Sequence, residues 1–323
     1  MNIVFLGSGP FAVPSLEVLW RHATRHPLRA VVSRPDRRAR RGRRLLQTPV
    51  KLRATELGVE CRSPESVGEA ESLAWLRSLD IDLCIVAAYG EILRRDFLDV
   101  PSLGTFNLHA SLLPKYRGAA PVAHAILAGE KTTGVTLFRI EEGLDSGPVV
   151  ARRETVIEAL ETAGELEERL SRLGAELLEE ELEAFAGGTH TETPQDHGLA
   201  TRAPKLGKEM GLLDWDVEAV TIRDRVRALN PWPTAYAFLE RQGREPERMA
   251  LLAVDVGDLE SAALPGTVVE VSGTGFQVAC RDGSVRVLEL QRQGKKALSS
   301  AAFLNGYPLR LSDRFLGETP PGG

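Results

Sequence analysis

Short apolar segments alternate with helical patterns over the first 190 residues, and this alternation constrains the fold more than any other feature of the sequence. The segments are bounded by Gly, Pro or Asp, which is typical of buried strands. They lie at Ile3–Leu6, Ala30–Val32, Leu83–Ala88, Thr105–Leu108 and Val135–Ile140. Strands that alternate with helices form an open, mostly parallel sheet. We therefore expect an N-terminal α/β domain of Rossmann-like architecture.

The second half of the chain follows a different pattern. Residues from about Gly187 to Leu206 are rich in Thr, Gly and Pro, which is typical of a linker. A helix is expected near Val217–Leu229, followed by strand patterns with Gly-containing turns. These strand patterns lie at Val268–Val271, Gly275–Ala279 and Ser284–Leu290. We expect one domain over residues 1–189, a linker over 190–206 and a smaller, OB-like β-barrel domain over 207–323.

The composition is that of an ordinary globular protein. Of the 323 residues 43% are hydrophobic and 26% are charged, and no apolar run approaches the roughly 20 residues that span a bilayer. The first residues indicate a strand rather than a signal peptide, so we expect a cytoplasmic protein without a membrane partner. The three cysteines are far apart in the sequence, which predicts neither a disulfide framework nor a metal cluster.

A strongly basic segment follows the second predicted strand. Arg34–Arg44 contains seven arginines and one aspartate, in a chain whose formal net charge is -5. Such a concentration of positive charge can bind a polyanion. The alternative is a solvated loop, and for a loop considered in isolation we favour that alternative.

The first turn, Gly7-Ser8-Gly9-Pro10, matches a loose form of the dinucleotide-binding fingerprint. Pro10 removes an amide from the turn that would hold the phosphates, and the acidic residue expected after the second strand is displaced. Both glycines serve equally well in a tight turn between a strand and a helix. We therefore favour a structural role over binding of NAD or NADP.

Three polar residues at two predicted strand ends form a more specific pattern. Asn107 and His109 are two residues apart, so both side chains project to the same face of an extended strand. Asp145 follows another predicted strand in a Gly-flanked turn, where a carboxylate can orient a histidine and favour its protonated form. An amide donor beside an imidazole suits acyl transfer through a charged tetrahedral intermediate.

Each of these residues also has an ordinary structural interpretation. Asn107 can cap a turn, His109 can be a hydrogen-bonded core histidine and Asp145 can be a turn residue, and singly these interpretations are favoured. Together the three favour a catalytic site, because none of the other five histidines has a comparable setting. The sequence lacks Gly-x-Ser-x-Gly and His-Glu-x-x-His motifs, so we expect neither a serine nucleophile nor a zinc site.

With these motifs in view, the sequence resembles the folate-dependent formyltransferases, and among them those that act on methionyl-tRNA. The resemblance covers essentially the whole chain. It rests on Pro35–Arg37, Arg41–Arg44, Asn107–Pro114, Arg117–Pro121, Gly143–Gly147, Lys205-Leu206, Asp214-Trp215, Asn230–Pro233 and Gly294–Ala297. The Asn-x-His and Ser-Leu-Leu-Pro motif belongs to the superfamily, whereas the basic loop together with the C-terminal domain is specific to the tRNA enzymes. Ala110 replaces a more usual glycine.

The resemblance implies a reaction and roles for the residues. The donor would be 10-formyltetrahydrofolate, the acceptor the α-amino group of initiator methionyl-tRNA, and no metal would be needed. Asn107 and His109 would hold the formyl oxygen, while Asp145 would keep His109 protonated and help to remove the proton of the amine. The pterin would be bound by Ser111, Leu112, Leu113 and Pro114, and by Tyr89 and Gly90.

The resemblance also assigns the basic residues to tRNA. Arg41, Arg43 and Arg44 would contact the acceptor end, because guanidinium groups suit phosphates and stack on unpaired bases. Lys295 and Lys296 would provide a second contact on the β-rich domain, since small β-barrels commonly bind nucleic acid. No obligate protein partner is indicated, and we expect a monomer.

Two other functions remain open at this point. A formyltransferase acting on an amino-sugar nucleotide would share the Asn-x-His motif, the aspartate and a related C-terminal domain, but such enzymes generally lack the arginine loop. A nonenzymatic RNA-binding protein on a degenerate fold of the same type is the other alternative. The intact set of Asn107, His109 and Asp145 argues against it.

Overall fold

The computed structural model describes residues 1–38, 45–311 and 313–318. The chain divides into two compact units. Unit 1 comprises Met1–Pro121, Thr132–Val156 and Glu167–Pro204, and unit 2 comprises Val122–Lys131, Ile157–Leu166 and Lys205–Gly323. The assignment of separate functional domains with boundaries at residues 189 and 207 stays a prediction.

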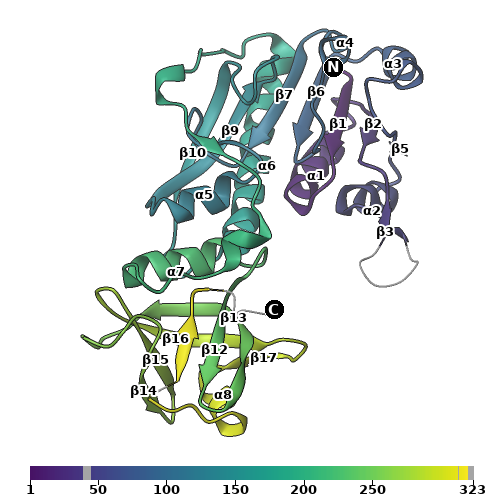
Figure 1. Cartoon of the computed structure of the whole chain (residues 1–323). Coiled ribbons are helices and arrows are strands. Elements are labelled where there is room, and N and C mark those ends of the chain that lie inside the picture. Colours follow the sequence, from purple (N-terminus) through teal and green to yellow (C-terminus); the bar gives the residue numbers. More distant parts are fainter. Residues whose placement is uncertain (39–44, 312, 319–323) are drawn as a thin grey trace. The chain divides into compact units, whose positions relative to one another are not determined.

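Unit 1 is built on a seven-stranded sheet with the order β10-β9-β7-β6-β1-β2-β5 (Figure 1). The five strands from β7 to β5 run parallel, and β9 and β10 add an antiparallel hairpin at one edge. The strands are β1 (Ile3–Gly7), β2 (Leu28–Val32), β5 (Cys61–Arg62), β6 (Leu83–Ala87), β7 (Gly104–His109), β9 (Thr132–Arg139) and β10 (Val149–Val156). The expectation of an open, mostly parallel α/β sheet is therefore confirmed.

Alternating side chains bury both faces of this sheet. Val4 and Leu6 of β1 share a cluster with Leu73 of α3 (Ala70–Arg77) and Phe97 of α4 (Arg95–Leu98). On β7, Phe106 packs against Phe185 of α6 (Ala163–Gly187). A strand covered on both faces is apolar throughout, and β1 and β6 are buried along their whole length. Unit 1 also contains α1 (Val13–Arg21) and α2 (Pro49–Glu56), whereas α5 (Pro121–Leu127) belongs mainly to unit 2 and α6 begins in unit 2 and continues in unit 1.

Unit 2 contains an antiparallel sheet with the order β14-β15-β16-β13-β12-β18, and β17 pairs with β16. A bridge between Thr267 and Arg314 joins its two edges, so the sheet curls into a barrel around a core that includes Phe276 and Phe315. This confirms the smaller C-terminal β-barrel. Its elements are α7 (Ala219–Ala228), β12 (Ala235–Arg241), β13 (Arg244–Val256), β14 (Val268–Ser272), β15 (Gly275–Cys280), β16 (Gly283–Arg292), β17 (Ala297–Ser299), α8 (Ser300–Gly306) and β18 (Arg314–Leu316).

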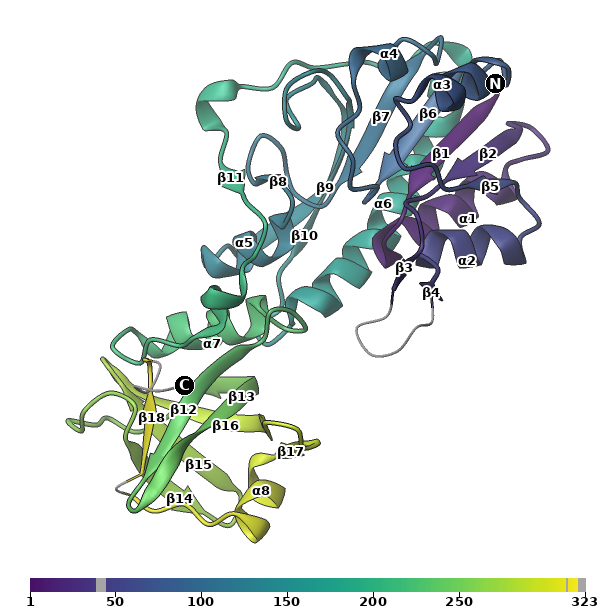
Figure 2. The same cartoon turned by 45° about the vertical axis from the view of Figure 1, so that its right-hand side comes forward.

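Two short strand pairs complete unit 1. β3 (Arg37–Arg38) pairs antiparallel with β4 (Leu45–Leu46), and β8 (Arg117–Gly118) pairs in parallel with β11 (Arg202–Ala203) (Figure 2). The second pair brings the segment before residue 204 alongside the turn that follows β7. No helix in the described parts of the chain is long and apolar enough to cross a membrane.

Replacing Phe106 with alanine is expected to lower the free energy of unfolding by about 3–5 kcal/mol, because it leaves a cavity between β7 and α6. The ring is fully buried, and its centroid lies 4.6 Å from that of Phe185. Urea denaturation followed by circular dichroism measures the loss. Leu199→Ala, at a side chain that is 63% exposed, serves as the control and should cost about 0.5 kcal/mol or less. Equal losses in the two variants contradict this packing.

Candidate active site

Asn107 and His109 lie at the carboxyl end of β7, between β6 and β9. Open α/β sheets bind their ligands at this edge. The His109 side chain is buried, whereas Asn107 is partly exposed. Within the described residues the Asn107 side chain has no hydrogen-bond partner, although its backbone pairs with Val86 and Phe138. Its amide is therefore available to a ligand.

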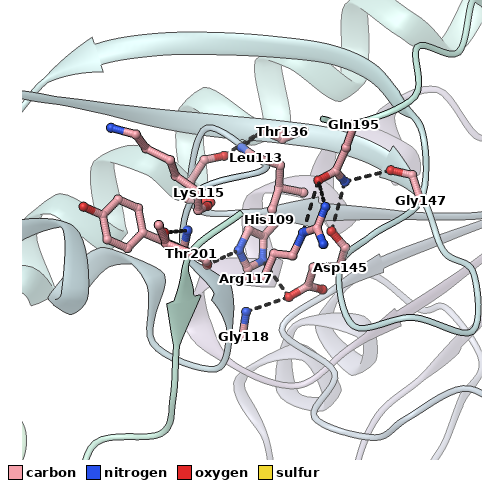
Figure 3. Close-up of polar contacts among 12 residues, drawn as sticks. His109, Leu113, Lys115, Arg117, Gly118, Thr136, Asp145, Gly147, Gln195 and Thr201 are labelled. Carbon is pink, nitrogen blue, oxygen red and sulfur yellow. Dashed lines mark hydrogen bonds and ion pairs between the residues drawn. The ribbon is translucent and has the colours of Figure 1, made fainter. Parts of the chain in front are cut away.

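The two ring nitrogens of His109 face different partners (Figure 3). Nε2 lies 2.9 Å from the Tyr116 carbonyl oxygen, and Nδ1 lies 3.9 Å from Oδ2 of Asp145. A carbonyl only accepts hydrogen bonds, so Nε2 must carry a proton and Nδ1 is the nitrogen that can gain or lose one. The 3.9 Å separation is longer than a hydrogen bond. When the ring is protonated, Nδ1 and the Asp145 carboxylate therefore interact electrostatically.

The Asp145 carboxylate is also held by the backbone of Gly118. Its Oδ2 atom accepts a hydrogen bond of 2.8 Å from the backbone N–H of Gly118, and the side chain is 15% exposed. The backbone of Asp145 has a φ of 47°, in the left-handed region that is unfavourable for residues with a Cβ atom. The structure thus brings His109 and Asp145 together, as the sequence predicts, while their catalytic roles stay predictions.

Two residues to which the sequence analysis gave no role complete this region. Gln195 donates from Nε2 to the carbonyl oxygens of Asp145 and Gly147, and its Oε1 accepts from Arg117 (Figure 3). Thr201 accepts a hydrogen bond from the Tyr116 N–H through its hydroxyl. Both Gln195 and Thr201 lie in the segment that the sequence predicts as a linker. Its composition carries no signal for these contacts.

The Ser-Leu-Leu-Pro turn is fixed by internal hydrogen bonds. Thr136 of β9 donates to the Ser111 carbonyl over 2.6 Å and accepts from the Leu113 N–H over 3.1 Å, while the Ser111 hydroxyl donates to the Lys115 carbonyl. The side chains of Ser111 and Leu113 are buried, whereas Leu112 and Pro114 are partly exposed. Binding of the pterin by this turn stays a prediction.

Tyr89 and Gly90 lie in the turn after β6. The Tyr89 side chain is buried, which raises the pKa of its hydroxyl and keeps it neutral, while Gly90 is exposed with a φ of 83°. Ser8, after β1, donates to the Tyr89 carbonyl over 3.1 Å. At Gly7 a Cβ atom would lie 2.8 Å from the Phe5 ring, which supports a structural role for this glycine.

The predicted tRNA contacts Arg41, Arg43 and Arg44 lie outside the described residues. The segment that precedes them is held by ion pairs and hydrogen bonds. Arg34 forms an ion pair with Glu91 and donates to the Glu65 carbonyl, and Asp36 pairs with Lys51 over 2.8 Å.

Lys295 and Lys296 lie in the turn between β16 and β17 and are both exposed. They line a pocket of about 210 Å³ together with Arg292 and Tyr307. The guanidinium groups of Arg241 and Arg292 lie 3.9 Å and 4.4 Å from the centroid of the Tyr307 ring. The Tyr307 ring itself belongs to the buried barrel core, and both its hydroxyl and Arg292 bond to Glu247. The exposed positive charge at this pocket is therefore that of the two lysines.

Comparison with known proteins defines the class of this chain. Residues 1–182 match the family model described as Formyl transferase, and residues 205–308 match the model described as Formyl transferase, C-terminal domain. A methionyl-tRNA formyltransferase from Citrifermentans bemidjiense is 41% identical over 310 residues, covering 96% of this chain and 95% of the relative. Another, from Xylella fastidiosa, is 44% identical over 307 residues, covering 94% and 97%. The chain belongs to the methionyl-tRNA formyltransferase family.

Solved structures share the fold at low sequence identity. The sugar 3N-formyl transferase WlaRD aligns with a TM-score of 0.64 at 16% identity, covering 92% of this chain and 99% of that protein. HypX from Aquifex aeolicus, in complex with tetrahydrofolic acid, aligns with a TM-score of 0.62 at 21% identity, covering 94% of this chain and 47% of HypX. These similarities support the fold alone.

Replacing Gly118 with alanine is expected to displace β8 from β11. The added Cβ atom would lie 2.5 Å from the Ala203 carbonyl oxygen, and the φ of Gly118 is 128°. Amide hydrogen exchange should therefore become faster in residues 117–120 and 201–203. Gly58→Ala is the matched control, because Gly58 also has a positive φ but its added Cβ would meet nothing within 4 Å. Unchanged protection in the Gly118 variant contradicts the close approach of the two strands.

Proposed function

We propose that this chain transfers the formyl group of 10-formyltetrahydrofolate to the α-amino group of methionine on initiator methionyl-tRNA, for translation initiation. The observation that supports the reaction best is the group at the carboxyl end of β7. It combines the Asn107 amide, which is available to a ligand, with His109 and a fixed Asp145 carboxylate. The family of the chain supplies the identity of donor and acceptor.

The three residues would divide the chemistry between them. The Asn107 amide would donate a hydrogen bond to the formyl oxygen as negative charge develops on it. His109 would stabilise the same charge when Nδ1 is protonated, and the Asp145 carboxylate, 3.9 Å away, would balance the positive charge of the ring. Asp145 would also help to remove the proton that the attacking amine loses. The bond between the formyl carbon and N10 of the donor would then break, and tetrahydrofolate would leave with a proton on N10.

The donor would bind at the turns that flank this group. Tyr89 and Gly90 follow β6, the strand beside β7, and Ser111, Leu112, Leu113 and Pro114 follow β7 itself. The internal hydrogen bonds of Ser111 and Leu113 suggest that these two residues hold the turn in place, while Leu112 and Pro114 are exposed enough to contact the pterin.

The tRNA would be bound by the basic elements of both units. Arg41, Arg43 and Arg44 would act at the acceptor end, and Lys295 and Lys296 would contact the phosphate backbone elsewhere. The exposure of the two lysines beside Tyr307 supports the second contact. We further propose that the protein acts in the cytoplasm as a monomer.

The variants His109→Ala and Asp145→Asn are each expected to lower the rate of formyl transfer by about 100-fold or more, because each loses a group that stabilises charge in the transition state. Single-turnover transfer of labelled formyl to charged initiator tRNA measures the rate. Titration with 5-formyltetrahydrofolate should show that folate binding is retained. Asp99→Asn, at an exposed carboxylate paired with Arg95, is the control. Wild-type rates in the first two variants exclude the proposed roles.

Replacing Lys295 and Lys296 together with alanine is expected to weaken tRNA binding and to reduce its dependence on salt. Each lost phosphate contact should make the slope of log affinity against log salt concentration shallower by about 0.7–0.9. Filter binding of initiator tRNA at several salt concentrations measures the slope. Lys131→Ala, at another exposed lysine, is the control. A slope equal to that of the wild type contradicts the contact.

A further inference from the structure

The turn that carries Asp145 needs outside support to keep its shape. Asp145 has a φ of 47°, a conformation that residues with a Cβ atom rarely adopt unless surrounding contacts enforce it. The preceding residues Glu141–Leu144 are exposed, so little packing holds them. The direction of the carboxylate therefore depends on a few specific hydrogen bonds.

Gln195 provides two of those hydrogen bonds. Its Nε2 atom donates to the carbonyl oxygen of Asp145 over 2.9 Å and to that of Gly147 over 2.7 Å. The residue is 5% exposed, so water competes little for these carbonyl groups. One amide thus joins the backbone on both sides of Ser146 and fixes the turn.

Gln195 is itself held by Arg117. The guanidinium group donates from Nε and Nη2 to Oε1 of Gln195 over 3.2 Å and 2.6 Å, and Nη2 also lies 3.1 Å from Nδ1 of His197. Arg117 directly precedes Gly118, whose N–H binds the Asp145 carboxylate. Asp145 is therefore held at two points. Gln195 binds its backbone carbonyl, and Gly118, the residue after Arg117, binds its carboxylate.

We propose that Gln195 is a positioning residue for formyl transfer, which it supports by holding Asp145 in the conformation that places its carboxylate beside His109. The proposal rests on the proposed function, because it assigns Gln195 no role apart from that of Asp145. Gln195 does not act on the substrate itself. The role depends on the two hydrogen bonds that Nε2 of Gln195 donates, because these bonds hold the turn that carries Asp145.

The test compares Gln195→Met, which loses both the donor and the acceptor, with Gln195→Glu, which keeps an acceptor toward Arg117 but loses the donors. Both variants are expected to lower kcat by about 10- to 100-fold, as misplacement of a catalytic group commonly does. The KM for 10-formyltetrahydrofolate should stay within about 2-fold of the wild-type value, because the donor-binding turns are untouched.

Gln277→Met is the matched control for loss of a buried glutamine. Gln277 is 2% exposed and bonds to Asp258 and Glu270 in the barrel, and none of these three residues has a role in the proposed chemistry. This variant should keep the wild-type kcat. If Gln195→Met fails to fold, Gln195→Glu retains the bond to Arg117 and carries the test.

A double-mutant cycle with Asp145→Asn separates positioning from a general structural effect. If Gln195 acts through Asp145, Gln195→Met should cause no further loss of kcat in the Asp145→Asn background. If the fold loss of kcat in the double variant equals the product of the two single losses, the proposal is overturned. It is also overturned if both Gln195 variants keep the wild-type kcat while Asp145→Asn alone is slow. A wild-type kcat in Asp145→Asn itself contradicts the catalytic role of Asp145, and the positioning role with it. Absence of formyl transfer by the wild-type protein contradicts the proposed function.

Discussion

The site depends above all on the hydrogen bond from the Gly118 N–H to the Asp145 carboxylate, beside the His109 ring. This bond links two turns that are distant in the sequence, one after β7 and one after β9. The carboxylate must stay close to the imidazole to balance its charge, yet Asp145 lies outside any strand and Gly118 belongs to a strand of only two residues. The pairing of β8 with β11 and the contacts of Gln195 supply the missing rigidity.

The parallel sheet explains why this chemistry lies where it does. Five parallel strands place their carboxyl ends at one edge, so the turns after β1, β6 and β7 meet there. Strand β7 lies between a parallel and an antiparallel neighbour, and its register fixes Asn107 and His109 relative to both. The apolar side chains on the two faces of the sheet keep this frame rigid. The polar groups at its edge are therefore not needed for packing and can bind and act on a substrate.

Much of this arrangement could be predicted from the sequence, because it follows from short-range patterns. The apolar runs predict the strands, and the two-residue spacing of Asn107 and His109 predicts that they share a face. The left-handed conformation of Asp145 could not be predicted, since it is imposed by contacts with residues 50 positions away. Gln195 was missed for the same reason: its segment has the composition of a linker, and its role is visible only in the hydrogen bonds that it makes to Arg117 and the Asp145 turn.

The decisive measurement is the identity of the acceptor that receives the formyl group. The purified protein is incubated with labelled 10-formyltetrahydrofolate and, separately, with charged initiator tRNA, charged elongator methionine tRNA and an amino-sugar nucleotide. We expect rapid labelling of the initiator tRNA, slower labelling of the elongator tRNA and none of the sugar nucleotide. Labelling of the sugar nucleotide alone, or of no acceptor, would contradict the proposed function.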